Sequence, residues 1–247
     1  MKKLLLALLM TVGLVSAAQA VDLTGNVGLT SDYRFRGISQ SQNNMAVQGG
    51  VDLTTDAGFY VGNWNSSISS TQYPNAAGVE SDVYAGYKKD VWRGVTIDVG
   101  SYNYFYPGAT NGSGPNFTTN ELYAGVGYGP VSFKYSQALS DYFGVANSKN
   151  TQYYQLDLNQ SLGFIDSSLE KLSFVAHAGR TEYRNNSDYN YADYNVGLNY
   201  DYNGWNIAGK YYQNGSYGTQ AKSFNTSTNG KELYKDTFVV SVTKFFN

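Results

Sequence analysis

The chain has 247 residues, with 17 basic and 19 acidic side chains, one histidine and no cysteine. Because the basic residues are neither in excess nor clustered, this is not the charge pattern of a nucleic-acid-binding protein, and no nucleic-acid partner is expected. The lack of cysteine excludes disulfides, and one histidine without cysteine excludes the common zinc patterns. No cofactor is therefore expected.

Residues 1–20 have the organisation of a secretory signal peptide. Lys2 and Lys3 precede an apolar run from Leu4 to Val15, and Ala18-Gln19-Ala20 offers small residues for cleavage. The alternative is a membrane anchor, but the run is shorter than the roughly 20 residues that a spanning helix needs. We expect residues 1–20 to be removed after export and residues 21–247 to form one domain.

Twelve segments of the mature chain alternate between apolar and polar residues. A tilted strand of roughly 10 residues is long enough to cross the hydrocarbon of a membrane. Nothing after Val21 is apolar for long enough to form a spanning helix. The expected strands are 22–36, 45–55, 58–68, 79–89, 94–105, 119–129, 131–140, 152–162, 171–183, 191–202, 205–214 and 234–246.

The connections between these segments alternate strictly between short and long. The short ones are 56–58, 90–94, 129–130, 163–170 and 203–204, and the long polar ones are 37–44, 69–78, 106–118, 141–151, 184–190 and 215–233. Short periplasmic turns and long extracellular loops are typical of outer-membrane barrels. The sequence therefore predicts an all-β, antiparallel transmembrane β-barrel of about twelve strands. Its longest loop, 215–233, is expected to fold inward.

Each strand should present one apolar and one polar face. In the first strand the row expected to face lipid is Leu23, Val27, Leu29, Tyr33 and Phe35, and similar rows follow in later strands. A base facing lipid at mid-depth would cost about 2–4 kcal/mol, so charged residues should face the lumen. The alternation is incomplete in 58–68, where Asn63 and Asn65 share the phase of Phe59 and Val61.

The charged residues on the opposite faces are the candidates for lining or constricting the lumen. They are Asp32, Arg34, Arg36, Asp52, Asp82, Lys88, Asp98, Glu121, Lys134, Asp157, Asp193 and Lys210. With Asp22 and Asp201 the set has nine acids and five bases, which suggests a weak preference for cations. In an alternative interpretation, the apolar rows form the core of a soluble sandwich, and this fold predicts the same alternation. The asymmetry of the loops and the end of the chain favour the barrel.

The end of the chain resembles the assembly signal of outer-membrane barrels, in which apolar residues alternate back from a terminal aromatic. Phe246, Val242, Val240 and Phe238 fit that pattern, whereas Lys244 interrupts it. Lys244 is expected near the periplasmic rim, where its ammonium group can reach water. The barrel assembly machinery and outer-membrane lipid are therefore expected partners.

Three stretches near the start of the mature chain carry a resemblance to a known family. They are Ser31-Asp32-Tyr33-Arg34-Phe35-Arg36-Gly37-Ile38-Ser39-Gln40-Ser41, Val47-Gln48-Gly49-Gly50-Val51-Asp52 and Gly58-Phe59-Tyr60-Val61-Gly62-Asn63-Trp64. The sequence here resembles the TorF family of porin-like proteins, over roughly residues 25–68. The resemblance implies an outer-membrane barrel of a Gram-negative bacterium, without a known substrate.

Within this motif, Asp32, Arg34 and Arg36 are expected on the lumen face of the first strand. They could form a charged constriction that filters solutes, or a buried charge network that rigidifies the barrel, and both interpretations stay open. Gly49 and Gly50 leave room for a bulky neighbour, for which Trp64 and Tyr84 are the candidates.

The single histidine, His177, is expected at mid-strand on the lumen side, where it is either a polar filler or a catalytic group. Loop residues such as Asn185, Asn186 and Asp188 are either solvated or a weak calcium site. Tyrosines near the strand ends fit interfacial girdles, with an aromatic sugar-binding lining as the alternative.

The functional prediction is an outer-membrane, porin-like channel for passive diffusion of small hydrophilic solutes, and not an enzyme. The alternative is a structural or adhesive barrel without a conducting pore. A catalytic barrel built on His177 is a third hypothesis.

Overall fold

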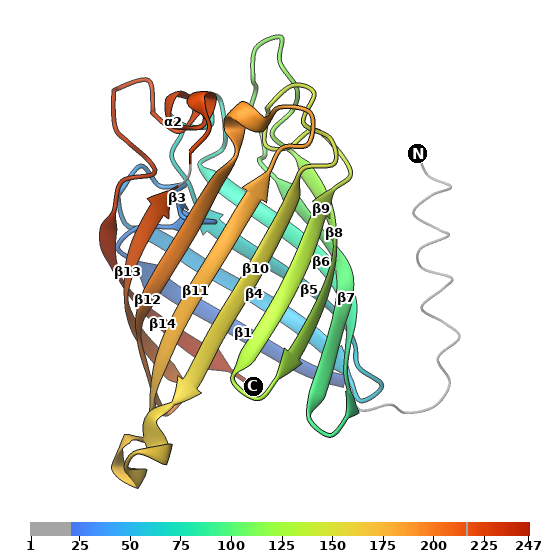
Figure 1. Cartoon of the computed structure of the whole chain (residues 1–247), viewed down its shortest axis with the longest axis vertical. Coiled ribbons are helices and arrows are strands. Elements are labelled where there is room, and N and C mark those ends of the chain that lie inside the picture. Colours follow the sequence, from blue (N-terminus) through green and yellow to red (C-terminus); the bar gives the residue numbers. More distant parts are fainter. Residues whose placement is uncertain (1–20, 216) are drawn as a thin grey trace.

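The computed structural model describes residues 21–215 and 217–247, so the expected signal peptide at 1–20 lies outside the described residues. Twelve strands form one closed antiparallel barrel in the order β1-β14-β13-β12-β11-β10-β9-β8-β7-β6-β5-β4 (Figure 1). The barrel closes because β1 pairs with both β4 and β14. In the described part of the chain, no helix is long and apolar enough to cross a membrane.

The barrel strands are β1 (Val21–Thr30), β4 (Ala46–Thr55), β5 (Phe59–Ser67), β6 (Val79–Trp92), β7 (Val95–Phe105), β8 (Thr119–Tyr128), β9 (Val131–Ala138), β10 (Gln152–Ser161), β11 (Leu172–Glu182), β12 (Tyr191–Tyr202), β13 (Trp205–Gly215) and β14 (Thr237–Phe246). Each matches one of the twelve expected segments. The predicted fold is confirmed, and the strand ends differ from the expectation by a few residues except in the first strand.

The five short connections gather at one end of the barrel, called here the short-turn end, and the six long ones gather at the other, the long-loop end (Figure 1). The connection between β10 and β11 protrudes from the short-turn end and contains two 3-10 turns, η2 (Leu162–Phe164) and η3 (Ser167–Leu169). At the long-loop end lie a third such turn, η4 (Ser187–Tyr189), and the short helix α2 (Thr219–Phe224).

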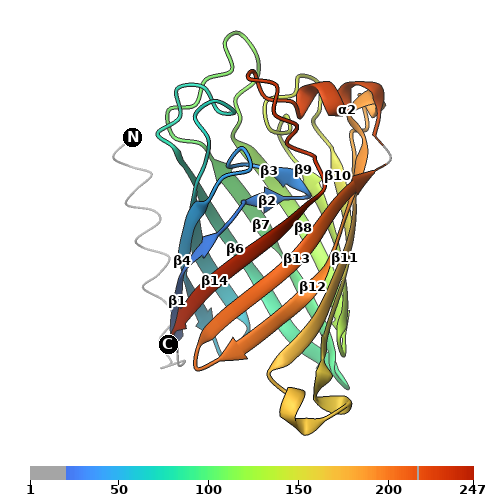
Figure 2. The ribbon, with the colours of Figure 1, turned by 90° about the vertical axis from the view of Figure 1, so that its left-hand side faces the viewer.

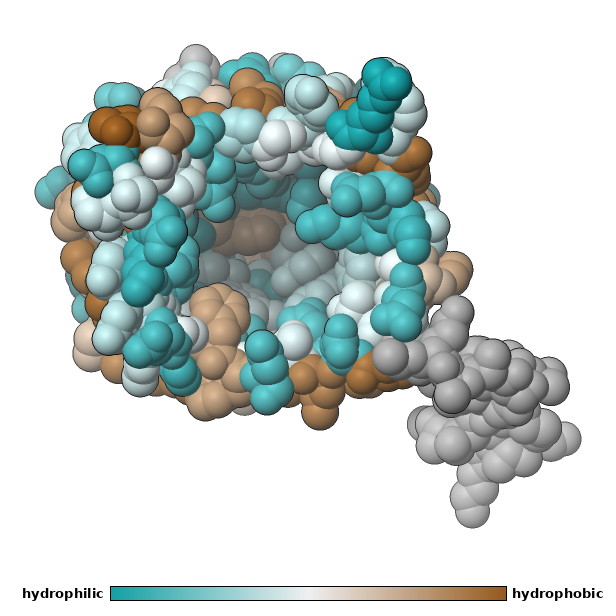
Figure 3. Space-filling model, turned by 90° about the horizontal axis from the view of Figure 1, so that it is seen from below, coloured by the Kyte–Doolittle hydropathy of each residue, from teal (hydrophilic) through white to brown (hydrophobic). Residues whose placement is uncertain are grey.

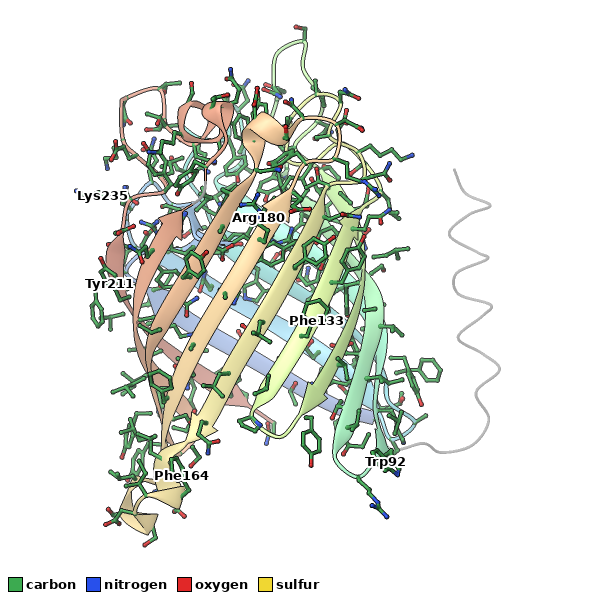
Figure 4. All side chains as sticks on the ribbon, viewed as in Figure 1. Trp92, Phe133, Phe164, Arg180, Tyr211 and Lys235 are labelled. Atoms are coloured by element: carbon green, nitrogen blue, oxygen red, sulfur yellow. The ribbon has the colours of Figure 1, made fainter. Side chains whose placement is uncertain are left out.

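The outer face of the barrel is largely apolar, in the phase expected from the sequence. Val27, Leu122 and Val196 have about half of their surface exposed although they lie in the middle of strands. Tyr211 and Trp92 project away from the wall (Figure 4). Lys244 also points outward, and its Nζ donates to the carbonyl oxygen of Asn203 at 2.6 Å in the β12–β13 turn. Its expected place at the rim of the short-turn end is confirmed.

The first expected strand is wrong beyond Thr30. Residues 31–45 leave the wall, and β2 (Arg34–Phe35) and β3 (Ile38–Ser39) form a two-stranded hairpin inside the barrel (Figure 2). Tyr33 and Phe35 therefore do not face lipid, and Asp32, Arg34 and Arg36 do not lie on the lumen face of β1. Arg36 and Gly37, with φ of 46° and 78°, form the turn, as the primed hairpin turns require.

The longest loop does not enter the lumen as expected, because the hairpin occupies that space. It lies over the long-loop end with α2 (Figure 2), and its buried Leu233 contacts the hairpin from above. The carbonyl oxygen of Leu233 accepts hydrogen bonds from the backbone N–H of Ser39 and from Arg34 Nη1. Two clusters of buried apolar side chains, one around Ile38 and one around Tyr33, flank the hairpin.

Candidate functional site

The barrel encloses a cavity of about 860 Å³, the main cavity, between the hairpin and the short-turn end. Figure 3 looks into the barrel from that end and shows a hollow interior with a mostly hydrophilic rim. Nine of the twelve charged candidates line the main cavity: Arg34, Arg36, Asp52, Asp82, Lys88, Asp98, Glu121, Lys134 and Asp193. The alternation of the strands thus placed these side chains inside the barrel.

The other three candidates lie elsewhere in the lumen. Asp32 and Lys210 line a side cavity of about 250 Å³ between the hairpin and the part of the wall that runs from β13 through β14 and β1 to β5. Asp157 contacts His177 on the neighbouring strand β11. A further cavity of about 250 Å³, the loop cavity, lies between the hairpin and the long loops. Phe35 lines both the main and the loop cavities, so the hairpin stands between them.

Arg36 fixes the tip of the hairpin to the far wall. Its Nη1 and Nη2 donate to the two carboxylate oxygens of Glu121 on β8, at 2.7 and 2.8 Å. The guanidinium also donates to the Tyr142 hydroxyl and lies 4.0 Å from the ring centre of Tyr153 on β10. Strands β8 and β10 flank β9, which is opposite β1 in the closed barrel, so the hairpin crosses the whole lumen.

Gly37 makes a second contact with the barrel wall, at β13 and β12. Its carbonyl oxygen accepts a hydrogen bond from Asn214 Nδ2 on β13 at 3.1 Å. A Cβ atom on Gly37 would come within 2.6 Å of Asp193 Cβ and would also clash with Asn214. The turn therefore needs glycine for its backbone conformation and for this close approach.

Asp32 and Arg34 hold the base of the hairpin together. Asp32 Oδ2 accepts from Arg34 Nε at 2.5 Å, while Oδ1 accepts from the hydroxyls of Ser39 and Ser41 at 2.6 and 3.0 Å. Both charged side chains are almost fully buried. The bonds join the two sides of the hairpin, as expected for a structural charge network.

Aromatic side chains pack around the hairpin toward the long-loop end of the lumen. Phe35 packs edge-to-face against Tyr104 and Phe143, and Tyr33 packs against Trp64. In the loop between β5 and β6, Tyr73 donates to the side-chain carbonyl of Gln40. Burial and the nearby Glu80 raise the pKa of the Tyr73 phenol well above its ordinary value, so it stays a neutral donor.

The wall formed by β4 to β8 combines acids with tyrosines. Asp52 accepts from Tyr84 and Asp98 accepts from Tyr60, both at 2.7 Å. Asp82 is 1% exposed, and among the described residues its Oδ1 has no hydrogen-bond partner. Lys88 on β6 and Lys134 on β9 line the same cavity, so the cavity carries both signs of charge.

His177 lies on the lumen side at mid-strand, as expected, and bridges two acids. Its Nδ1 is 2.7 Å from Asp157 Oδ1, and its Nε2 is 2.9 Å from Asp193 Oδ1. The hydroxyl of Tyr153 donates to both oxygens of Asp193. An imidazole held between two carboxylates is a suitable structural bridge across β10, β11 and β12. In the described residues no group of three or more side chains suited to hold a metal ion is found.

The hairpin and its anchor are the part of the site that the sequence did not predict. A signal was present, because Arg36-Gly37 stands between Phe35 and Ile38 like a two-residue turn. Trp64, one of the two residues expected to fill the space beside Gly50, does so. Its Cδ1 would lie 3.3 Å from a Cβ atom on Gly50. The other alternative, Tyr84, instead lies against Gly62.

Two solved porin structures share this barrel fold. The KdgM porin aligns with a TM-score of 0.54 at 10% identity, covering 92% of this chain and 100% of that one. The NanC porin aligns with a TM-score of 0.53 at 12% identity, with the same coverage of 92% and 100%. At such low identity the likeness concerns the fold. The comparison with curated proteins gave no match.

A family model matches almost the whole sequence, from residue 15 to residue 246. It does not carry the name TorF, so that resemblance stands only as far as a barrel of porin fold. The matching description is "Bacterial protein of unknown function (Gcw_chp)". This chain belongs to the Gcw_chp family.

Proposed function

We propose that the protein is an outer-membrane channel for the passive diffusion of small hydrophilic solutes, with the β2–β3 hairpin as its constriction. The observation that carries the proposal is the Arg36–Glu121 pair, which fixes a hairpin across the lumen between two cavities. In this proposal the short-turn end faces the periplasm and the long-loop end faces the cell exterior. The expected cleavage of residues 1–20 after export agrees with this location.

The two faces of the wall support a membrane channel. An apolar outer face is suited to lipid, and a charged, hollow interior is suited to water and polar solutes. A solute that crosses the barrel must pass the hairpin, whose residues Arg36, Phe35 and Gly37 contact different parts of the surrounding wall and loops. Charged and aromatic side chains at such a narrow point would filter solutes by size and by charge.

A weak preference for cations is part of the proposal. Asp52, Asp82 and Asp98 form no direct ion pair among the described residues, whereas Arg34 and Arg36 are paired with acids. Lys88 and Lys134 offset part of this negative charge. The net field of the main cavity should therefore favour cations only slightly.

A structural or adhesive barrel without a conducting pore is the second candidate. It is favoured by the way in which the hairpin and the two buried clusters separate the main cavity from the loop cavity. The long loops would then be the working surface. The two candidates differ in whether ions cross the barrel.

Conductance in planar lipid bilayers distinguishes them. The wild-type protein should give discrete conductance steps, and a variant with residues 34–39 replaced by two glycines should give larger ones. A difference in gel migration between unboiled and boiled samples verifies that each variant is folded. If neither protein conducts, the channel proposal is wrong and the structural barrel is supported. If only the shortened variant conducts, the hairpin is a plug and passive diffusion through the closed barrel is excluded.

A further inference from the structure

A patch of uncharged polar side chains interrupts the apolar outer face of the barrel on β5 to β8. These residues alternate along their strands with lumen-facing side chains such as Trp64 and Tyr102, so they point outward. The patch, called here the amide patch, consists of Asn63, Asn65, Ser81, Asn103 and Asn120. It includes the two asparagines that break the alternation of β5, and the channel proposal gives them no role.

The asparagines form two relays of hydrogen bonds that converge on β6 from both sides. From β5, Asn65 Nδ2 donates to Asn63 Oδ1 at 2.6 Å, and Asn63 Nδ2 donates to the carbonyl oxygen of Asp82 at 2.7 Å. From β8, Asn120 Nδ2 donates to Asn103 Oδ1 at 2.7 Å, and Asn103 Nδ2 donates to the carbonyl oxygen of Val83 at 3.1 Å.

Both relays end with hydrogen-bonding capacity to spare. Among the described residues, no donor is found for the side-chain oxygens of Asn65 and Asn120. Each terminal amide also has a second N–H, because a carboxamide carries two N–H donors and one oxygen acceptor. The patch therefore presents donors and acceptors together on one surface.

Apolar side chains enclose the amide patch toward both ends of the barrel. Val79 and Phe105 point outward on its long-loop side, and Val61, Val99 and Leu122 point outward on its short-turn side. The patch therefore lies within the band that would face hydrocarbon. Lipid chains offer no hydrogen-bond partners there, so such groups are costly unless protein covers them.

We propose that the amide patch is an interface at which two copies of this chain associate within the membrane. Amides suit this occupant because each offers both a donor and an acceptor, so identical patches can satisfy each other across a two-fold axis. Gly49, Ser67 and Ser101 also lie on the outer face next to the patch, and small residues let two membrane surfaces approach closely.

Lipid headgroups fit the amide patch less well. Recognition of anionic lipid needs clustered lysine or arginine side chains, and the patch contains none. A second copy supplies what the patch lacks, namely amide partners at the same depth in the membrane.

Cysteine cross-linking tests the interface, since the natural chain contains no cysteine. Single variants Asn63→Cys, Asn65→Cys, Asn103→Cys and Asn120→Cys are oxidised in outer-membrane fractions, or treated with a short bismaleimide. Val196→Cys is the matched control, because Val196 points outward at mid-strand on β12, the strand opposite β6. At least one patch variant should form a covalent dimer several-fold more efficiently than the control.

A second pair of variants separates association from folding. Asn63→Leu with Asn103→Leu should abolish the dimer cross-linked through Asn120→Cys, while heat-modifiable gel migration shows that the barrel is folded. Gln152→Leu, an outward amide of β10 away from the patch, should leave the dimer intact.

The proposal is overturned if no patch variant cross-links above Val196→Cys, or if the leucine variants leave the cross-linked dimer unchanged. Lipopolysaccharide bound to a monomer through the patch, detected by native mass spectrometry and lost in the leucine variants, would also overturn it. Bilayer conductance is measured separately, so this result does not depend on whether the barrel is a channel.

Discussion

Arg36 and Glu121, which are 85 positions apart in the sequence, form a two-pronged ion pair across the lumen at 2.7 and 2.8 Å. Their side chains are only 7% and 2% exposed. Arg36 has a φ of 46°, a conformation that is uncommon for residues other than glycine, asparagine and aspartate. The ion pair thus holds a turn whose backbone is unfavourable for arginine.

Arg36→Asn should release the hairpin tip. Asparagine tolerates the left-handed turn, so the turn itself is preserved, whereas Glu121 loses its counter-charge in a buried place. Breaking a buried pair in this way costs roughly 3–5 kcal/mol, enough to undock the hairpin. Single-channel recordings should show larger and noisier conductance than for the wild type. The double variant Arg36→Asn with Glu121→Gln should lose less stability than the single variant Arg36→Asn, because no buried charge is left unpaired.

Gly37→Ala should also displace the hairpin, for a different reason. The added methyl group would meet Asp193 and Asn214, and the φ of 78° is unfavourable for alanine. Gly230→Ala is the matched control, since Gly230 has the same φ of 78° with nothing within 4 Å of the added atom. The protein is heated in steps before electrophoresis, and the temperature at which half of it loses the folded migration is measured. This temperature should fall for Gly37→Ala by more than for the control. Equal shifts would mean that the close approach at Gly37 does not matter.

The barrel was predictable from the sequence because its physical basis is local. Side chains alternate across a strand, and a charge facing lipid is costly, so Asp52, Asp98 and Lys134 could be assigned to the inside. The alternation of short and long connections gave the orientation of neighbouring strands. Neither argument requires knowledge of which residues meet in space.

The hairpin was not predictable in the same way. Asp32, Arg34 and Arg36 continue the alternation of Val21–Thr30, so the local pattern extends the strand to residue 36. Tertiary contacts draw the chain away from the wall after β1. Asp32 accepts hydrogen bonds from Ser39 and Ser41, and Arg36 pairs with Glu121. The outward asparagines of β5 were visible as an irregularity, but their relays to β6 depend on strand register, which the sequence alone did not supply.

His177→Phe should destabilise the barrel without changing the conductance of its lumen. Asp193, which is 2% exposed, would lose its basic partner, and among the described residues the hydroxyl of Tyr153 would be its remaining hydrogen-bond donor. The expected loss is roughly 3 kcal/mol, as for other buried acids left without a counter-charge. Thermal unfolding should report the loss, and conductance steps should keep their size. Asp157→Asn should cost less, since Asp157 is 32% exposed. A catalytic barrel would instead lose an activity in His177→Gln at unchanged stability.

Neutralising acids on the wall of the main cavity should reduce the preference for cations. Asp52 and Asp98 keep their tyrosine partners as Asp52→Asn and Asp98→Asn, because the amide oxygen can still accept from Tyr84 and Tyr60. One unit charge near a permeating ion contributes about 1 kcal/mol in water at about 4 Å, so selectivity should change several-fold. The reversal potential in a potassium chloride gradient measures this change.

Lys134→Gln provides the test of opposite sign, because Lys134 lines the same cavity beside the ring of Tyr123. Its reversal potential should move toward stronger cation selectivity, while Asp52→Asn moves it away. Both shifts should shrink at high salt, where charges are screened over a few ångströms. If both variants shift the potential in the same direction, or neither does, permeating ions do not pass this wall, and the cation preference assigned to the main cavity is wrong.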